Sequence, residues 1–500
     1  MIYSNFNNNR LLRDLERLDY QKYKSRRKSP LRKIGKFLIA LAIFFAVLFI
    51  IFFVKNAISH STSESWLDRV PVIGQIKHLA ENSSAKLEGE DEGRVNILIL
   101  GVGGKDHEGS ELTDTIMIAS VNIEKKKVAL LSIPRDLSVP IQGRGWQRIN
   151  HINSYAESSN PGDGGKITSE QIDKLLNAPI HYYVKIDFEG FEETIDTLGG
   201  IKVNVANTFD DYMYPIYGME ENPVYDNRYE TLHFDKGWQK MDGETALKYA
   251  RSRHAYGIEG TDFARAARQQ KVVQAIKDKA LSAGTLLNPV KVSSLISDID
   301  EHIETNMKIW EIVKLWRDIQ DVSEENMINK VLSNQPNGLL ADSITEEGAY
   351  ILIPRAGNFG EIQYLFENIF EEVPEDDKRI IQNEGAKVKV LNGTWISGLA
   401  GKTALDLERH GFNIVSVTNC SRQDFETSVI YDLTYGEKKE SLKLLKETTK
   451  ANVSFNLPQW LKDDIVAEIN KSPETAQADI ILILGENANR SYTTTGAIGE

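Results

Sequence analysis

The chain has 500 residues, of which 41% are hydrophobic and 26% are charged, and its formal net charge is −13. This length exceeds one ordinary domain core, and the composition excludes a wholly disordered or collagen-like chain. The single cysteine, Cys420, excludes an internal disulfide framework and a cysteine-rich zinc site.

An apolar run from Phe37 to Val54 (FLIALAIFFAVLFIIFFV) contains no charged or polar side chain. Its length is about that of a helix that spans a bilayer core, so residues 37–54 are predicted to be a transmembrane segment. A buried core helix would normally show a polar face. A cleavable signal peptide would have a shorter preceding arm and a small-residue cleavage site after the run. A retained signal anchor therefore fits best.

Residues 1–36 form a basic arm with eleven lysines and arginines against three acidic residues, a net charge of +8. Positive charge beside a membrane span keeps that end in the cytoplasm. The rest of the chain carries −21 and is expected outside, since −13 minus 8 leaves that value. The prediction is a single-pass protein of the bacterial cell membrane, with a cytoplasmic N-terminus and an extracytoplasmic bulk. The basic arm is explained more simply by topology than by nucleic-acid binding.

Residues 55–93 are predicted to be a linker, because they include the polar stretch from Glu81 to Gly93. The next segments alternate between apolar β-branched runs and helical patterns, which predicts a layered α/β domain with a central mixed sheet. The expected elements are strands over 96–100, 114–123 and 127–133, a helix over 167–177 capped by Ser169 or Thr168, a strand over 180–187, a helix ending at Gly199 and Gly200, and a strand over 201–205.

The region from about 206 to 237 is rich in Tyr, Asp and Asn, and predicts a lid or surface insertion. The expected elements after it are helices over 244–250, 262–281, 287–299 and 306–319, strands KVLSN and AYILIPR, and a helix over 360–370. These elements define a first domain over 94–373. The remaining segments are a charged linker over 374–386, a small second α/β domain over 387–486 and a flexible tail over 487–500.

Arginine and carboxylate side chains recur at the ends of the predicted elements, where active sites tend to lie. Asp114 begins a strand, Arg135 and Asp136 directly follow another, and Asn150 and His151 stand together in RINH. A single histidine such as His151 is more often structural than a catalytic base.

Two arginines in KYARSRH, Arg251 and Arg253, are two residues apart. Such positions share a side in an extended segment but not on a helix, so the run is predicted to leave the helix and aim both guanidinium groups one way. In TDFARAARQQ, Arg265, Arg268 and Gln269 lie on one helical face. One guanidinium group can bind two phosphate oxygens at once through two N–H donors. Any single arginine, however, is more often part of a surface salt bridge. The spacing by itself therefore predicts a candidate anion pocket.

These segments, in this order behind one apolar run, resemble the LytR-CpsA-Psr family of cell-wall glycopolymer ligases. The resemblance covers residues 94–276 and is carried by DTIMIASVN, LLSIPRD, RINH, YVKIDFEGFEETIDTLGGIKVNV, DGETALKYARSR and DFARAARQQKVV. Residues 387–485 resemble the LytR C-terminal domain through VKVLNG and ADIILILG.

The resemblance implies an extracytoplasmic enzyme that transfers a glycopolymer from a polyprenyl-pyrophosphate carrier to peptidoglycan. The lipid tail would lie in an apolar tunnel beneath the central sheet. The catalytic residues that it implies are Arg135, Arg251, Arg253, Arg265 and Gln269. The expected substrate phosphate-binding residues are Arg135, Arg251, Arg253, Arg265 and Arg268. Asp114 would hold Mg²⁺ (or Mn²⁺), or alternatively would help to deprotonate the acceptor hydroxyl.

One departure from the family pattern is Gly103, which stands where many members carry an aspartate. Either a metal ligand is missing or Asp106 replaces it. Two other functions use the same residues: a polyprenyl-pyrophosphate phosphatase with water as acceptor, and a non-catalytic protein that binds lipid or cell wall. Dependence on an acceptor separates the first from a ligase, and metal-dependent turnover separates the second. The sequence offers no DNA-reading helix, so nucleic acid is not expected as a partner.

Overall fold

The computed structural model describes residues 85–489 except 105–108, 217, 220–221, 281, 283–301, 321 and 472–477. Within these residues, six strands form a central sheet in the order β11-β6-β1-β2-β3-β12. Their bounds are Ile303–Thr305 (β11), Tyr182–Ile186 (β6), Val95–Val102 (β1), Thr113–Asn122 (β2), Lys127–Ser132 (β3) and Met327–Val331 (β12). β1 pairs in parallel with β6, and β3 with β12, whereas the other neighbours are antiparallel. The predicted mixed sheet is confirmed.

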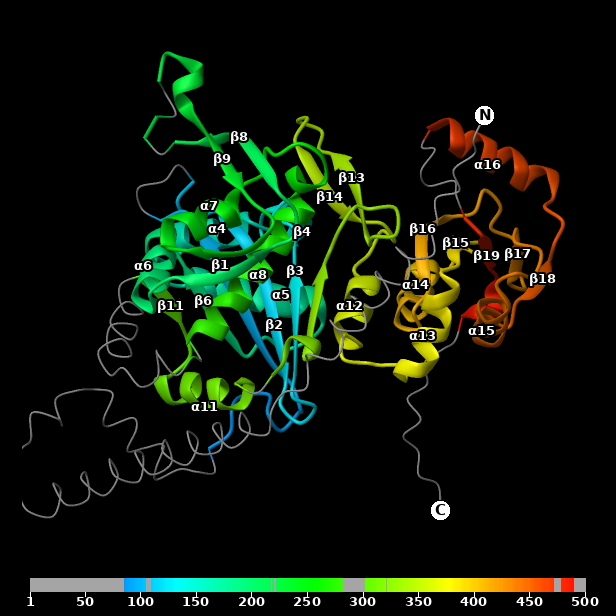
Figure 1. Cartoon of the computed structure of the whole chain (residues 1–500), viewed down its shortest axis with the longest axis horizontal. Helices are drawn as coiled ribbons and strands as arrows, with labels where there is room; N and C mark the ends of the chain where they lie inside the picture. Colours follow the sequence, from blue (N-terminus) through cyan, green and yellow to red (C-terminus); the bar gives the residue numbers. More distant parts are fainter. Residues whose placement is uncertain are drawn as a thin grey trace, which may run out of the picture. The chain divides into compact units, whose positions relative to one another are not determined.

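Both faces of this sheet are covered, because successive strand residues point to opposite sides and both sets are apolar. Leu98 and Ile118 pack into one core with helices α4, α5 and α12, and Ile97 and Met117 pack into another with α8 and α11. The helix bounds are His151–Ser159 (α4), Gly164–Leu176 (α5), Gly360–Glu367 (α12), Asp262–Ala280 (α8) and Ile309–Ile319 (α11). The result is a layered α/β domain (Figure 1).

The described part of the Tyr/Asp-rich region, which was predicted to be a lid or surface insertion, is a β-hairpin. β8 (Phe209–Pro215) pairs with β9 (Tyr229–Phe234), and the hairpin extends away from the central sheet in Figure 1. Its apolar side chains pack against α6 (Phe188–Leu198), β7 (Ile201–Val205) and α7 (Gly243–Arg251). This packing fixes the base of the hairpin beside α7, the helix that carries Arg251.

The strand predicted over 201–205 is β7, and it pairs with β10 (Gly237–Met241) outside the central sheet. Two further local predictions differ from the structure. The helix predicted from residue 167 begins at Gly164, so the hydroxyl of Thr168 donates to the Gly164 carbonyl inside the helix at 2.8 Å and caps nothing. The charged segment predicted as a linker contains helix α13 (Glu375–Glu384), which ends at Gly385 with a φ of 59°. In each case, tertiary packing determines the local secondary structure, which local composition alone does not specify.

Two more hairpins are β4 (Ser138–Ile141) with β5 (Gly145–Arg148), and β13 (Leu340–Ile344) with β14 (Tyr350–Pro354), and a bridge between Leu137 and Leu352 connects them. Further along the chain, five described strands form a second sheet in the order β16-β15-β19-β17-β18. Their bounds are Asn413–Asn419, Lys387–Asn392, Ile480–Leu484, Val429–Asp432 and Asn452–Ser454, and the accompanying helices are α14 (Leu399–Arg409), α15 (Lys439–Thr449) and α16 (Gln459–Lys471). The second α/β fold thus agrees with the sequence pattern.

Several sequence predictions lie outside the described residues. They are the basic arm, the apolar run 37–54, most of the first linker, the helix over 287–299 and most of the tail. Among the residues that the structure describes, no helix is both long and apolar enough to cross a membrane.

Candidate active site

One pocket of about 120 Å³ brings together most of the predicted site residues. The predicted residues that line it are Asp114, Arg135, Arg251, Arg253, Arg265 and Gln269. They come from the start of β2, the turn after β3, the end of α7 and the first turns of α8. Among the described residues that line it, four arginines face two carboxylates, so the pocket is positively charged. Guanidinium groups stay protonated when water is excluded, so this pocket is suited to phosphate.

The Asp114 side chain holds Arg135 in place. Nη1 of Arg135 donates to Oδ1 of Asp114 at 2.6 Å, and Nε of Arg135 lies 3.7 Å from Oδ2 of Asp136. Oδ1 of Asp136 in turn lies 3.2 Å from Nη1 of Arg148. Arg135 is therefore fixed from two sides by carboxylates, and its direction is set before any ligand arrives.

The RINH motif supports this turn through its backbone. The buried Asn150 accepts hydrogen bonds at its carbonyl from the N–H (3.2 Å) and hydroxyl (3.3 Å) of Thr113, and its N–H donates to the Arg135 carbonyl at 3.3 Å. His151 begins α4 and lies 3.2 Å from the Tyr155 hydroxyl. Burial and the neighbouring Arg148 hold the pKa of His151 below its ordinary value. Its position supports the structural interpretation, since it does not line the arginine pocket.

The two arginines of KYARSRH are positioned by a buried carboxylate, Asp211 of β8. Helix α7 ends at Arg251, and Ser252 is extended (φ −51°, ψ 133°). Oδ2 of Asp211 accepts from the Ser252 hydroxyl (2.7 Å), the Arg253 N–H (2.9 Å) and the His254 N–H (3.1 Å). As predicted, the run leaves the helix, and both arginines line the same pocket.

Asp211 itself is fully buried. Burial raises the pKa of Asp211, but the hydrogen bonds from the Ser252 hydroxyl and from backbone N–H groups outweigh this and hold it below its ordinary value. The guanidinium of Arg251 stacks over the Phe188 ring at 4.1 Å and donates to the Tyr214 hydroxyl at 3.4 Å. Arg251 thus rests on two aromatic side chains that also line the pocket.

The three predicted site residues of α8 divide between two roles. Arg265 and Gln269 line the pocket, but Arg268, which the sequence placed with them, does not. Arg268 is 3% exposed and donates to the carbonyls of Tyr249 (3.1 Å), Glu259 (2.9 Å) and Ser252. Its guanidinium is used inside the fold, so the predicted phosphate-binding role of Arg268 is corrected to a structural one.

Sequence reasoning missed Phe188, Asp211 and Tyr214, all of which line the pocket. Phe188 lies inside the motif FEGFEETIDTLGG but carries no charge that would draw attention to it. A signal for Asp211 exists in FDDYMYP, where Phe209 and Asp211 are buried at alternate positions of β8. A carboxylate on the apolar side of a strand needs several donors, which marks it as a positioning residue.

Asp114 is the carboxylate of this pocket that is suited to a divalent cation. The other pocket carboxylate, Asp211, is already occupied by four donors, since Oδ1 also accepts from the Met213 N–H at 3.1 Å. Mg²⁺ in phosphoryl-transfer sites is commonly held by one or two carboxylates together with substrate phosphates. The side chains present therefore fit a cation that arrives with the substrate. Asp106, the suggested replacement for the residue at Gly103, lies outside the described residues.

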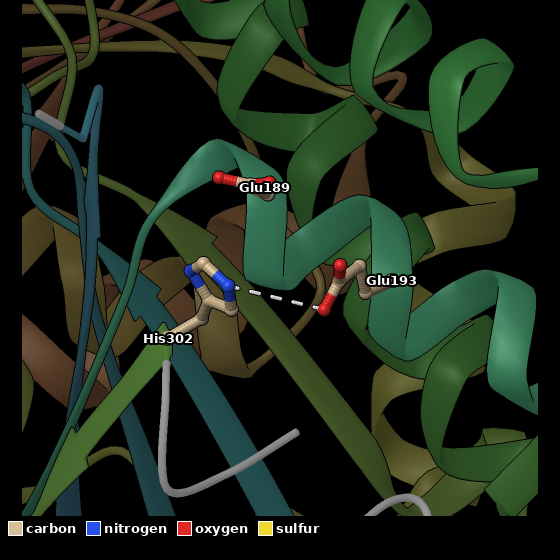
Figure 2. A group of neighbouring side chains, drawn as sticks. All are labelled: Glu189, Glu193 and His302. Atoms are coloured by element: carbon tan, nitrogen blue, oxygen red, sulfur yellow. Dashed lines mark ion pairs between the residues drawn. The ribbon is translucent and has the colours of Figure 1, made fainter. Parts of the chain in front are cut away.

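A separate group of ligand-type side chains consists of Glu189, Glu193 and His302, whose ligand atoms lie within 4.8 Å of one another. Figure 2 shows both glutamates on α6 and the ring of His302 between them and β11. His302 Nδ1 lies 3.2 Å from Oδ2 of Asp187, and Nε2 lies 3.9 Å from Glu193. The hydrogen bond with Asp187 raises the pKa of His302, while burial acts against it. Pairing of His302 with Asp187 and Glu193 accounts for this geometry.

Within the described residues, a mixed α/β domain brings four arginines to one pocket, a lining that suits a phosphorylated ligand. The sequence model of the LytR_cpsA_psr family matches residues 68–367. The chain therefore belongs to the LytR_cpsA_psr family, which confirms the resemblance. A second model, described as LytR cell envelope-related transcriptional attenuator, matches residues 385–487.

Several relatives are named polyisoprenyl-teichoic acid–peptidoglycan teichoic acid transferases. TagU of Oceanobacillus iheyensis is 28% identical over 298 residues, which cover 59% of this chain and 82% of that protein. TagU of Enterococcus faecalis is 32% identical over 206 residues (41% and 59%), and TagV of Bacillus subtilis is 31% identical over 218 residues (43% and 50%). The crystal structure of B. subtilis TagV aligns with a TM-score of 0.42 at 26% identity, over 56% of this chain and 98% of that chain.

Proposed function

We propose that this chain is a phosphotransferase that moves a glycopolymer from a polyprenyl-pyrophosphate carrier to peptidoglycan. The observation that carries the proposal is the pocket lined by Arg135, Arg251, Arg253 and Arg265, which supplies the positive charge and the guanidinium donors that suit a pyrophosphate. The names of the relatives supply the substrate class, since each is named as a transferase between polyisoprenyl-teichoic acid and peptidoglycan.

The proposed reaction is a displacement at the phosphorus that bears the glycan. A hydroxyl oxygen of peptidoglycan forms a bond to this phosphorus, and the bond from phosphorus to the bridging oxygen breaks. Polyprenyl phosphate leaves with that oxygen, and the hydroxyl proton passes to solvent. The products are a glycan–phosphate–peptidoglycan diester and polyprenyl phosphate.

The arginines serve this reaction by holding charge that develops on the bridging and non-bridging oxygens. Arg135 is fixed by Asp114 and Arg251 by its aromatic supports, so neither has to reorganise during the reaction. Asp211 has a positioning role. It accepts three hydrogen bonds from the segment Ser252 to His254, and as a carboxylate it does not donate to a phosphate.

Asp114 is proposed to hold Mg²⁺ or Mn²⁺ together with the substrate phosphates. When bound, the cation would supply neutralisation of the pyrophosphate charge. Arg135 donates to Oδ1 of Asp114, which makes Oδ2 the oxygen proposed for the cation. Gly103 provides no carboxylate beside it, so we expect weaker cation binding than a site with two carboxylates would have.

The proposed location is the outer side of the bacterial cell membrane. The support is the apolar run 37–54 behind an arm of net charge +8, together with the acidic remainder of the chain. A membrane anchor would keep the pocket close to the lipid-linked donor. The polyprenyl tail is proposed to lie against the apolar layer between the central sheet and α11, which includes Ile97, Met117 and Leu130.

The test uses the detergent-solubilised full chain, a lipid-pyrophosphate-linked sugar, Mg²⁺ and peptidoglycan oligomers that are added or withheld. Mass spectrometry should detect sugar phosphate on the peptidoglycan only when enzyme, metal and acceptor are all present. Equal cleavage of the lipid without peptidoglycan would instead identify a phosphatase. Bound but unconverted lipid would identify a non-catalytic binding protein.

A further inference from the structure

A second hollow, of about 230 Å³, adjoins the arginine pocket and shares four of its residues. The shared residues are Asp114, Arg135, Arg265 and Gln269. Away from this shared wall, the hollow is bounded by the first turn of α8, the segment that follows β12 and the strand β14. A group held on the shared wall would therefore face two separate spaces.

The far wall of this second hollow differs in chemistry from the arginine pocket. It carries Ser333, Asn334 and Gln335 together with the aromatic rings of Phe263 and Tyr350. Asn334, Phe263 and Tyr350 are exposed, so a ligand can reach them. Hydroxyl and amide groups can both donate and accept hydrogen bonds, and aromatic rings pack against the C–H faces of a sugar. Neutral polar groups beside exposed rings suit a saccharide better than an anion or an apolar chain.

The polar groups of this wall are held in fixed positions. Oδ1 of Asp342, on β13, accepts from both Asn334 Nδ2 (2.7 Å) and the Tyr350 hydroxyl (2.6 Å). The turn itself is closed by hydrogen bonds from the Leu340 N–H to the Ser333 carbonyl (2.9 Å) and from the Gly338 N–H to the Gln335 carbonyl (2.7 Å). With Nδ2 engaged, Asn334 presents its carbonyl oxygen as a preorganised acceptor for a ligand hydroxyl.

We propose that this second hollow is the acceptor subsite, which binds a sugar of the peptidoglycan strand through Asn334 and Tyr350. The inference rests on the proposed function and adds the place from which the nucleophile enters. In phosphoryl transfer the attacking and leaving oxygens lie roughly in line through phosphorus. If the phosphoryl group binds at the shared wall, the acceptor hydroxyl attacks it from the second hollow. Polyprenyl phosphate then leaves on the opposite side, through the arginine pocket.

The test compares Asn334→Ala and Tyr350→Ala with the unchanged full chain in the transfer assay. The KM for peptidoglycan oligomers should rise about tenfold in each variant, as expected when a ligand loses one or two contacts. The KM for the lipid-linked donor should stay within about twofold, since the donor phosphates bind to the arginines. Asn337→Ala, in the same turn but outside the hollow, is the matched control and should leave both values unchanged.

A direct binding measurement keeps this inference separate from the proposed function. Saturation-transfer NMR with a soluble peptidoglycan tetrasaccharide, without donor, should show contact in the unchanged chain and in Asn337→Ala but not in Asn334→Ala. If the unchanged chain turns over no donor but binds the tetrasaccharide in this way, the proposed function fails and the subsite stands. Equal rises in both KM values would assign the hollow to the donor glycan and overturn the proposal. Unchanged acceptor KM and unchanged tetrasaccharide binding in both variants would also overturn it.

Discussion

The substitution Asp211→Asn tests whether a buried carboxylate outside the predicted motifs sets the positions of Arg251 and Arg253. The aspartate accepts three hydrogen bonds at Oδ2 and one at Oδ1. Asparagine has the same shape but one acceptor oxygen. If that oxygen stays on the three-donor side, the new NH₂ group faces the Met213 N–H and one hydrogen bond is lost.

The expected loss of stability follows from these contacts. Hydrogen bonds to a charged acceptor contribute about 1 kcal/mol more than neutral ones, so weakening three of them costs roughly 3 kcal/mol, and losing the fourth costs about 1 kcal/mol more. The expected fall in the free energy of unfolding is therefore roughly 4 kcal/mol, which for a domain of this size corresponds to a fall in Tm of about 8–16 °C. Turnover of the lipid donor should fall by roughly a hundredfold, because a shift of about 1 Å in positioned groups has effects of that order.

The measurement is a thermal melt with initial rates on the same preparation. Asp210→Asn is the matched control, since Asp210 is the neighbouring residue but its side chain pairs with His233 at 2.7 Å.

The stability that Asp211 contributes should also depend on pH. The folded-state pKa of Asp211 is lowered, so its contribution to the free energy of unfolding is present above the ordinary aspartate pKa of about 3.9 and is lost as pH falls through the folded value. The difference between wild type and Asp211→Asn should therefore shrink below about pH 4. A variant with wild-type Tm and more than about a third of wild-type turnover would refute the positioning role.

Three shorter predictions concern other charged residues. Arg253→Ala should abolish turnover of the lipid donor and leave Tm nearly unchanged. The control Arg317→Ala, at an exposed arginine, should alter neither turnover nor Tm. Wild-type turnover in Arg253→Ala would exclude the proposed phosphate contact. Arg268→Met should lower Tm by several degrees, since the buried carbonyls of Tyr249 and Ser252 lose their donor. A wild-type Tm in this variant would exclude the structural role of Arg268. Because the hydrogen bond with Asp187 raises the pKa of His302, its contribution is full below about pH 6.5 and is lost as pH rises through the folded value. The Tm difference between wild type and His302→Gln should thus be larger at about pH 5.5 than at about pH 8.5, and equal differences would exclude the ion pair.

The sequence predicts the central sheet well because its strands are covered on both faces. β1, β2 and β3 are long apolar runs bounded by turn residues, and that pattern needs no knowledge of distant contacts. The same pattern does not identify strand partners. β7 has an apolar alternation like that of the sheet strands, yet it pairs with β10 outside the central sheet, because tertiary packing determines which strands pair.

The site could be predicted from the sequence to the extent that residue type and spacing identify its charged residues. Arg135, Arg251, Arg253 and Arg265 meet in one pocket, but charge and spacing could not separate Arg268 from Arg265 on the same helix. The difference is the neighbourhood of each residue: Arg268 faces the carbonyls at the end of α7, which only the folded chain brings close. Asp211 was missed for the same reason, since its donors lie about forty residues further along the chain.

Gly103 gives a final test of how the cation is held. Val102 pairs with Thr113 across the β1–β2 ladder, so position 103 directly follows the partner of the residue that precedes Asp114. A carboxylate at this position would add negative charge next to the proposed cation site. Gly103→Asp should therefore lower the Mg²⁺ concentration for half-maximal turnover by about tenfold, which needs only ~1.4 kcal/mol of added attraction. Gly103→Asn is the control, because it has nearly the same size without the charge. If both variants keep the wild-type Mg²⁺ dependence, position 103 does not face the cation, and Asp114 with the substrate phosphates holds it without a second carboxylate there.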